Sequence, residues 1–335
     1  MPELPEVEGV ARTLRRSILG GIVTGVSLQR MDMLLLDTQG EPLRAAIRRR
    51  RAGTRSDSPA IRSSSAPRTE GAMLHGGRVK AIHRQGKQCA IEVDDGRVLV
   101  VHLGMSGRLQ LLRPRDPMAP HTHAVWTIST GDQTNELRFV DPRRFGGLCA
   151  IASLTDLRER IWSHLGPDAL TLSGKALAQA CSARHRPIKA LLLDQACVAG
   201  IGNIYADEIL HAAGIHPLEP ANRLVAQATL IARLTRSILA DAVRLGGSTI
   251  RDYIDPAGQG GSYQQRHRVY GRLNEACRGR NGRPCTARIE AVTVAGRTSW
   301  FCPRCQKLST GHSRPVEKSI RSPVKARSRA SGRSL

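Results

Sequence analysis

The second residue is the first place where this sequence offers unusual chemistry. Pro2 follows Met1, and removal of that methionine would expose a secondary amine. The pKa of an N-terminal amine lies well below that of a lysine, so more of it is neutral and nucleophilic at physiological pH. Attack on a sugar C1′ would expel a base and leave an iminium, and Glu3 or Glu6 could protonate the opened ring. Proline at this position and acidic residues in the first turn of a helix are also common without such a function.

A second chemical feature is a group of cysteines near the end of the chain. The chain has eight cysteines, and four of them crowd the C-terminal region, which favours a metal site over disulfides in a reducing compartment. These four are Cys277, Cys285, Cys302 and Cys305. The other four stand in apolar or mixed surroundings and are expected to be reduced thiols of the core, namely Cys89, Cys149, Cys181 and Cys197.

The charge balance indicates a polyanionic partner. Lys and Arg total 51 against 28 Asp and Glu, a formal net charge of +23 with a pI near 11.0. Such an excess suits nucleic acid through phosphate neutralisation, although basic tails and solvated surfaces give the same composition without that function. The N-terminus has no apolar signal region, and no stretch approaches about 18 uncharged apolar residues. We therefore expect a cytoplasmic, nucleoid-associated protein without a membrane partner.

Hydrophobic spacing divides the chain into a β-rich part and a helical part that must position these groups. Residues 3–18 have a helical pattern. Short strand-like runs follow at 22–28, 79–83, 89–93, 98–103, 108–112, 124–129, 136–140 and 147–151. Helical patterns then occupy 155–163, 173–183, 187–195, 202–213 and 220–244, ahead of a short β-rich module over 268–307. We expect an α+β protein with an N-terminal antiparallel β-sandwich domain and a C-terminal helical domain.

Two segments contain few core-forming residues. Residues 48–72 are rich in Ser, Arg, Ala and Pro, and we interpret them as a disordered insertion in the first domain. This insertion could be an additional DNA-contacting arm or a tolerated surface loop. Residues 308–335 hold seven Lys or Arg against one Glu, which predicts a disordered basic tail.

A series of motifs resembles one known family along nearly the whole chain. In order, the motifs are PELPEVE at 2–8, GKQCAIEV at 86–93, HLGMSGRL at 102–109, DPRRFG at 141–146, HLGPD at 164–168, IKALLLDQ at 188–195, AGIGNIYADEILHAAGIHP at 199–217, VYGR at 269–272 and GRTSWFCPRCQK at 296–307. They resemble the bacterial formamidopyrimidine-DNA glycosylases. Only the 48–72 insertion and the tail fall outside the resemblance.

The resemblance implies roles for four catalytic residues. Pro2 would be the Schiff-base nucleophile and Glu3 the acid that assists ring opening, while Glu6 would be a second, structural carboxylate. Lys87 matches a lysine linked to β-elimination and to a phosphate beside the lesion, although by itself it resembles a surface lysine at a strand end. Arg297, in a hairpin turn, matches an arginine that grips phosphates and is assigned to δ-elimination.

The resemblance also implies a set of DNA-binding residues. Met105 and Phe145 would wedge into the space left by a flipped base, and Arg143 would donate to the estranged cytosine. The segment 199–217 resembles part of a helix–two-turns–helix, in which exposed amides at a helix start favour anions. The other implied phosphate or lesion contacts are His102, His121, Arg184 and Asn203, with Lys189 in the same segment as Arg184.

The expected zinc-finger-type hairpin departs from the family pattern of two C-x2-C pairs. Cys302 and Cys305 form one pair, but Arg280 stands where the partner of Cys277 is expected. The next thiol is Cys285, which follows Cys277 after seven intervening residues. We favour the interpretation that Cys285 completes a site for one Zn²⁺ per chain. The alternatives are a weaker site with three thiolates and another ligand, or a hairpin that packs without metal.

The resemblance therefore implies a bifunctional DNA glycosylase and abasic-site lyase of base excision repair. It would act as a monomer on double-stranded DNA containing 8-oxoguanine or formamidopyrimidines, without a redox or organic cofactor. Residues 1–152 would form the catalytic domain, 153–267 the DNA-binding helical domain and 268–307 the hairpin. The alternatives are an oxidised-pyrimidine glycosylase of the same superfamily, a non-catalytic lesion binder and, more distantly, a structural zinc-ribbon protein.

Overall fold

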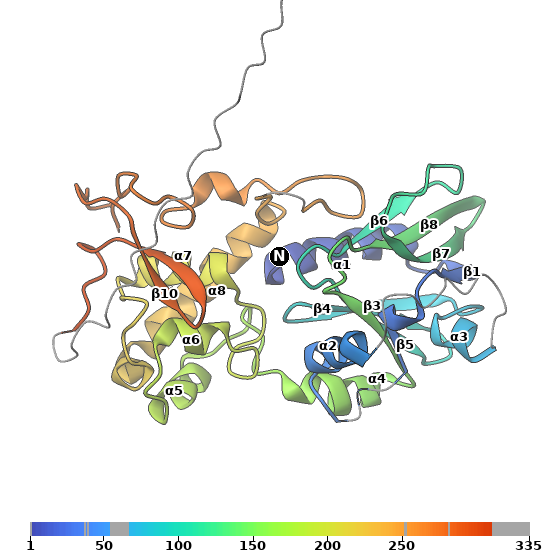
Figure 1. The fold of residues 1–335 in the computed structure, drawn as a ribbon, viewed down its shortest axis with the longest axis horizontal. Helices are drawn as coiled ribbons and strands as arrows, with labels where there is room; N and C mark the ends of the chain where they lie inside the picture. The colour runs from blue at the N-terminus through green and yellow to red at the C-terminus, as the bar shows by residue number, and fades with distance from the viewer. Residues whose placement is uncertain are drawn as a thin grey trace, which may run out of the picture.

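Two halves make up the described part of the chain, which comprises residues 2–36, 38, 40–53, 67–250, 253–280 and 282–309 of a computed structural model. The strands of the N-terminal half lie beside the helices of the C-terminal half (Figure 1). The expected α+β class is confirmed. Within the described residues, no helix is both long and apolar enough to cross a membrane.

The strands of the N-terminal half form two sheets that enclose a core. One sheet has the order β1-β7-β8-β6 and the other the order β2-β9-β5-β4-β3, and only the β2–β9 pair is parallel. Leu99 and Val101 of one sheet meet Trp126 and Phe139 of the other in one buried cluster, so the expected sandwich is confirmed. The strands are β1 (Ile22–Leu28), β2 (Leu34–Leu35), β3 (Val79–Gln85), β4 (Gln88–Val93), β5 (Val98–His102), β6 (Arg108–Leu112), β7 (Thr122–Thr130), β8 (Gln133–Val140) and β9 (Gly147–Ile151).

Helix α1 (Leu4–Ile18) joins the two halves. Its buried side chains recur with the period of one helical face, at Leu4, Val7, Val10, Leu14 and Ile18. Leu4 belongs to the core of the helical half, whereas the other four belong to the sandwich core. The start of the chain is therefore fixed where the two cores meet.

Helices occupy both ends of the segment that we expected to be disordered. Helix α2 (Leu43–Gly53) includes residues 48–53, and helix α3 (Pro67–Ala72) forms the other end. The expectation of disorder is wrong for these two ends. Residues 54–66 lie outside the described part of the chain, so the rest of that prediction is not tested.

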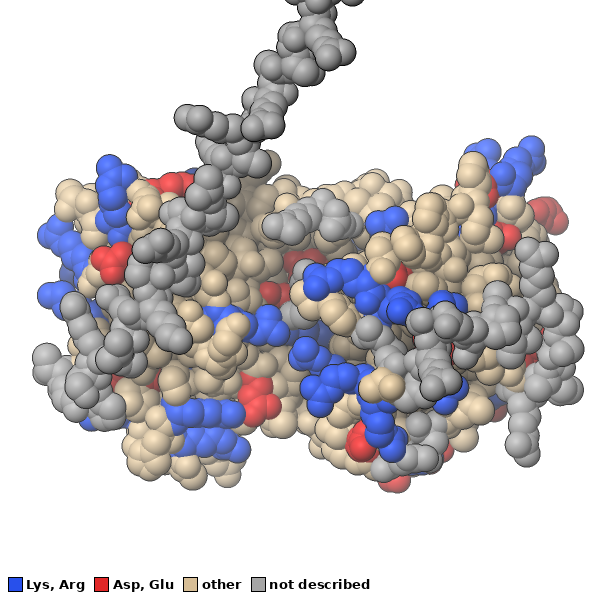
Figure 2. Space-filling model, in the orientation of Figure 1, with Lys and Arg blue, Asp and Glu red and all other residues tan. Residues whose placement is uncertain are grey.

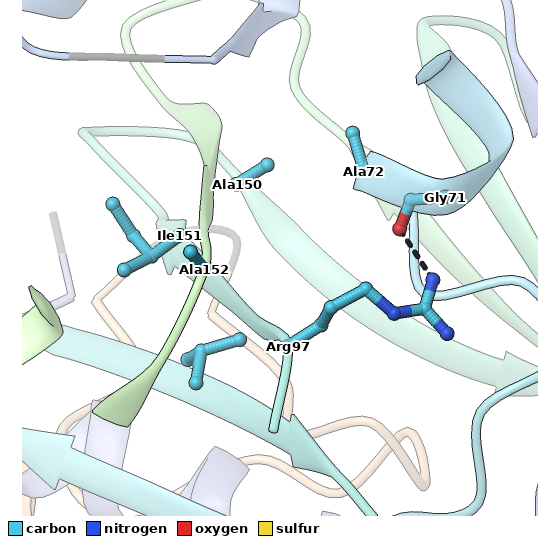
Figure 3. A pocket seen from close by; sticks show the side chains of 7 residues that line it. Gly71, Ala72, Arg97, Ala150, Ile151 and Ala152 are labelled. Atoms are coloured by element: carbon cyan, nitrogen blue, oxygen red, sulfur yellow. Dashed lines mark hydrogen bonds between the residues drawn. The ribbon is translucent and has the colours of Figure 1, made fainter. Parts of the chain in front are cut away.

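Packing on the sandwich explains why the two ends are ordered. Leu43, Ala46 and Ile47 of α2 are buried against the outer face of the five-stranded sheet. This packing stabilises the helix, and the amino-acid composition of the segment does not reveal it. For α3, Arg97 in the turn before β5 donates to the Gly71 carbonyl at 2.6 Å, beside a small cavity (Figure 3).

The C-terminal half consists of short helices followed by a hairpin. Helix α4 (Leu154–Asp156) still packs on the five-stranded sheet of the N-terminal half. The elements of the C-terminal half are α5 (Gly174–Ser182), α6 (Ile188–Leu193), α7 (Asn203–Ala213), α8 (Ala228–Arg244), β10 (Glu290–Val294) and β11 (Arg297–Phe301). The helix expected over 220–244 is divided, because Ala221–Gln227 is a 3₁₀ helix. Shorter 3₁₀ or π turns occupy Met31–Met33, Leu157–Ile161, Trp162–His164 and Tyr263–Arg266. Beyond residue 309, the predicted disordered tail lies outside the described residues.

Candidate active site

A cavity of about 700 Å³ lies between the two halves and gathers residues from distant parts of the sequence. Pro2 comes from the chain start, Lys87 from the turn between β3 and β4, and Arg297 from the first position of β11. Three more predicted residues also line it: His102, Met105 and Phe145. The fold thus brings three of the four predicted catalytic side chains into one space, although they are separated by up to 295 positions (297 − 2) in the sequence.

Glu3, the fourth predicted catalytic residue, is anchored directly behind Pro2. Its buried carboxylate accepts hydrogen bonds from the backbone amides of Gly202, Ile204 and Tyr205, at 2.7, 2.9 and 3.4 Å. Donors at the start of α7 suit a carboxylate, because the helix dipole favours negative charge there. We expected amides at this helix start to attract a phosphate, but in this structure the Glu3 carboxylate occupies those of Gly202, Ile204 and Tyr205.

Glycine makes this close approach possible. A Cβ added at Gly202 would lie 2.2 Å from the Glu3 Cδ, and one added at Gly200 would lie 2.4 Å from the Leu4 side chain. The Gly-Ile-Gly sequence therefore admits the start of α1 against the start of α7.

Glu6 is a buried structural carboxylate in the same network. Its Oε1 accepts from the Tyr205 hydroxyl and the Ser248 amide at 2.7 Å each, and its Oε2 accepts from the Glu3 amide at 2.7 Å. Burial, followed by repulsion from Glu3, raises the pKa of Glu6 above its usual range. The Glu6 carboxylate therefore helps to hold the N-terminus between the two halves.

The tight turn that carries Lys87 is fixed by charge and by packing. Asp168 accepts from the Gly86 amide at 2.8 Å and pairs with Arg84 at 2.6 Å. Gly86 has φ +54°, and a Cβ there would meet Ala199 at 2.9 Å. Burial lowers the pKa of Lys87 to about 8, and the positive charge of Arg297 lowers it as well. A lysine with this pKa has a large neutral fraction near physiological pH.

Two adjoining loops carry the predicted void-filling residues. Met105 and Phe145 are 39% and 37% exposed, which is unusual for large apolar side chains and leaves part of each side chain open to solvent. The Arg143 guanidinium lies 4.8 Å from the centre of the Phe145 ring. Buried Asp141 ties the loops together by accepting from the Ser106 hydroxyl at 2.6 Å and the Gly146 amide at 2.7 Å.

The remaining residues predicted to contact DNA differ in their exposure and in their distance from the cavity. His102 lines the cavity, and burial lowers its pKa to about 4, which keeps its ring neutral. His121 and Arg184 are exposed but do not line the cavity. The Asn203 side-chain amide donates to the Thr298 carbonyl at 3.0 Å, which ties the start of α7 to β11.

A buried ion pair supports the strand that begins with Arg297. Lys189 lies 2.7 Å from Asp207, both side chains are 0% exposed, and Lys189 also donates to the Thr298 carbonyl at 3.1 Å. Asp207 accepts from the Trp300 amide at 3.1 Å. Burial raises the pKa of Asp207 to about 7 and lowers that of Lys189. Lys189, which we grouped with possible DNA contacts, is therefore a structural residue that DNA cannot reach.

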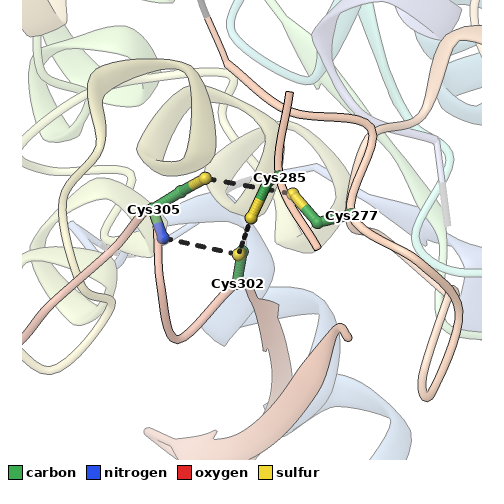
Figure 4. A group of neighbouring side chains, drawn as sticks. All are labelled: Cys277, Cys285, Cys302 and Cys305. Carbon is green, nitrogen blue, oxygen red and sulfur yellow. Dashed lines mark hydrogen bonds between the residues drawn. The ribbon is translucent and has the colours of Figure 1, made fainter. Parts of the chain in front are cut away.

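The four C-terminal cysteines converge at the base of the hairpin (Figure 4). Their sulfur atoms all lie within 4.8 Å of one another, with Cys277 and Cys305 at 4.0 Å and Cys285 and Cys302 at 3.7 Å. Four thiolates bound tetrahedrally at about 2.3 Å from one zinc ion would be roughly 3.8 Å apart. The donor set therefore fits a metal ion such as zinc, and Cys285 lies within this group of four thiols.

A tight turn explains how Cys285 compensates for the displaced second cysteine. The backbones of Arg280 and Arg283 pair with each other, and Gly279 and Gly282 adopt left-handed conformations beside them. The chain thereby folds back and returns Cys285 to the metal-binding group. The Arg280 guanidinium packs over Gly214 at the end of α7.

Several cavity-lining residues were not anticipated from the sequence. The largest group lies at the start of α2 and comprises Pro42–Ala45, Ile47 and Arg48, and others are Gln88, His164 and Asp194–Ala196. The apolar spacing of Leu43, Ala46 and Ile47 was a detectable signal for the helix. Its position beside the cavity depends on packing between distant elements, which has no local signature.

Comparisons with known proteins agree with this geometry. A family model described as the formamidopyrimidine-DNA glycosylase N-terminal domain matches residues 1–148, and the family's H2TH domain matches residues 165–254. A formamidopyrimidine-DNA glycosylase from Chloroflexus aggregans is 37% identical, covering 92% of this chain and 99% of the relative.

Solved structures extend the comparison to three dimensions. A Lactococcus lactis Fpg variant in complex with DNA containing Fapy-dG has a TM-score of 0.74 and 30% identity, covering 91% of this chain and 100% of that chain. The MutM (Fpg) protein of Thermus thermophilus has a TM-score of 0.72 and 34% identity, covering 92% of this chain and 99% of that chain.

Proposed function

This chain belongs to the formamidopyrimidine-DNA glycosylase family, whose members are DNA glycosylases and abasic-site lyases of base excision repair, and we propose that it excises oxidised purines with Pro2 as the nucleophile. The observation that carries the proposal is the cavity shared by Pro2, Lys87 and Arg297, with Glu3 anchored behind Pro2. The proposed substrates are 8-oxoguanine and formamidopyrimidines opposite cytosine in double-stranded DNA.

The first chemical step uses the amine of Pro2. With Met1 removed, the nitrogen attacks C1′ of the damaged nucleotide, the base departs and a covalent iminium forms. The Glu3 carboxyl group assists ring opening by protonating the sugar ring oxygen, which lies beside the new C1′–N bond. Its three backbone donors hold it close to Pro2, so the two groups act from a fixed geometry.

Strand cleavage follows from the same intermediate. The iminium acidifies the C2′ proton, and neutral Lys87 accepts protons during β-elimination near its pKa of about 8. Arg297 binds the phosphate that leaves in δ-elimination, which would produce a gap with phosphate ends. The Lys189–Asp207 pair and Asn203 support this assignment, because they fix the backbone of Thr298 and Trp300 next to Arg297.

The exposed loops account for recognition of the damaged pair. Met105 and Phe145 occupy the space of the extruded base, and Arg143 reads the partner cytosine from its position beside Phe145. We propose that His102 faces the damaged nucleotide inside the cavity, while His121, Arg184 and Asn203 contact phosphates along the duplex.

We propose that Cys277, Cys285, Cys302 and Cys305 hold one zinc ion per chain. When bound, zinc supplies no reaction step but stabilises the hairpin through four thiolate bonds. The hairpin in turn presents Arg297 to the cavity. Action as a monomer and a cytoplasmic location both remain predictions.

Borohydride trapping tests this function most directly. Protein with Met1 removed is incubated with a duplex containing 8-oxoguanine opposite cytosine, and we expect a covalent adduct that disappears when a retained N-terminal tag blocks Pro2. Binding without an adduct or cleavage would instead support the non-catalytic lesion binder. A matched duplex with an oxidised pyrimidine tests the other branch of the superfamily.

A further inference from the structure

Helix α2 presents a one-sided row of arginines to the cavity. Arg44 and Arg48 are exposed, are separated by one helical turn, and both line the cavity. The opposite face buries Leu43, Ala46 and Ile47 against the sheet, so the direction of the two arginines is fixed by packing.

These two arginines differ from their neighbours in having no protein partner. Within the described part of the chain, neither side chain makes a hydrogen bond or ion pair. By contrast, Arg49 lies 3.3 Å from the Glu41 carboxylate, and Arg50 donates to the Met31 carbonyl at 3.3 Å. The mouth of the cavity therefore holds guanidinium groups with unused donors.

The cavity as a whole has an excess of positive charge. Arg44, Arg48, Lys87 and Arg297 line it, and the single carboxylate among the lining residues, Asp194, is paired with Arg186 at 2.8 Å. Figure 2 shows Lys and Arg side chains gathered beside the hollow between the two halves. The buried Glu3 and Glu6 partly balance the charge of Lys87, so Arg44 and Arg48 are the lining cations most available to a polyanion.

We propose that α2 is a phosphate clamp in which Arg44 and Arg48 bind backbone phosphates of the damaged strand beside the nucleotide in the cavity. This proposal rests on the proposed function, because it takes the cavity to hold a DNA nucleotide. The guanidinium fork matches two phosphate oxygens, which makes arginine well suited to this contact.

The salt dependence of DNA binding tests whether Arg44 and Arg48 contact phosphates. The probe is a duplex with an uncleavable abasic-site analogue, and the variants are Arg44→Gln/Arg48→Gln and the control Arg49→Gln. Each phosphate contact contributes about 0.9 to the slope of log Kd against the logarithm of the salt concentration. The slope of the double variant should therefore be smaller than that of the wild type by about 1.8. Between about 50 and 200 mM salt, the wild-type affinity should thus fall roughly 12-fold further than that of the double variant.

The control variants separate the clamp from a general charge effect and from damage to the fold. Arg49→Gln should retain the wild-type slope, and Arg44→Lys/Arg48→Lys should recover most of the loss because the charge returns. An unchanged slope in the Gln double variant overturns the clamp. It is also overturned by an equal loss in Arg49→Gln or by the absence of recovery with lysine.

The proposed function and the clamp fail in distinguishable ways. Absence of any borohydride adduct with wild-type protein contradicts the proposed function. A normal wild-type adduct together with an unchanged slope in the Gln double variant contradicts the clamp alone.

Discussion

Removing Lys189 should destabilise the protein strongly, because it leaves Asp207 without its counter-ion in the core. Both side chains are fully buried and 2.7 Å apart. Breaking such a pair by removing one partner costs about 3–5 kcal/mol, since the remaining charge has lost its counter-ion without regaining water. Lys189→Met should therefore lower the thermal midpoint by roughly 6–20 °C, measured by calorimetry or circular dichroism.

The pH dependence of this loss identifies its cause. Burial already raises the pKa of Asp207 to about 7 beside Lys189, and loss of the lysine raises it further. Above pH 7 the wild-type carboxyl ionises at little cost, whereas the variant must stay protonated or hold an unpaired charge. The stability deficit of Lys189→Met should therefore grow as pH rises from about 7 to about 9.

A second substitution provides the matched control. Lys189→Met/Asp207→Asn removes the unpaired charge and keeps an oxygen to accept from the Trp300 amide, so most of the lost stability should return. A loss below about 1 kcal/mol in the single variant would refute the argument, as would a double variant no more stable than the single one. In the recovered double variant, Thr298 loses its bond to Lys189, so δ-elimination should fall more than base excision.

Three further predictions concern the site itself. Arg143→Ala should weaken the preference for cytosine by about 1–3 kcal/mol in single-turnover assays against four partner bases, and equal turnover against all four by the unmodified protein would argue against the assignment. Cys285→Ser should reduce bound zinc from about one per chain, measured by metal analysis with Cys181→Ser as the control, and an absence of zinc in the unmodified protein would contradict the four-thiolate site. The elimination rate on a preformed abasic site should rise as pH passes about 8, because the neutral fraction of Lys87 rises there. Lys87→Arg keeps the charge but cannot become neutral, so it should remove that rise, and an unchanged pH profile would exclude Lys87 as the base.

Local patterns were sufficient to predict the elements that carry the site. The spacing of Leu4, Val7, Val10 and Leu14 predicted α1, and alternating residues predicted most strands, because these signals arise within a few neighbouring positions. The resemblance identified Pro2, Lys87 and Arg297, which line one cavity as a set of catalytic groups would require.

Interactions between distant segments could not be predicted in the same way. Glu3 was assigned from its position beside Pro2, and its role in capping α7 depends on amides about 200 residues away. The order in α2 depends on the sheet beneath it, which overrides a run of arginines that suggested disorder. The return of Cys285 depends on a turn at Arg280 and Arg283, where the sequence offered only an irregular spacing.

The place of α1 between two cores also bears on when the protein becomes active during synthesis. Pro2 is synthesised well before its surroundings, because the amides that fix Glu3 and the arginine that completes the cavity follow some 200 and 295 residues later. Leu4 has no core to enter until the helical half has formed. A partly synthesised or truncated chain would therefore carry a reactive amine without the surroundings that direct it to DNA. If Pro2 is the nucleophile, we expect DNA cleavage only by chains whose two halves have both folded.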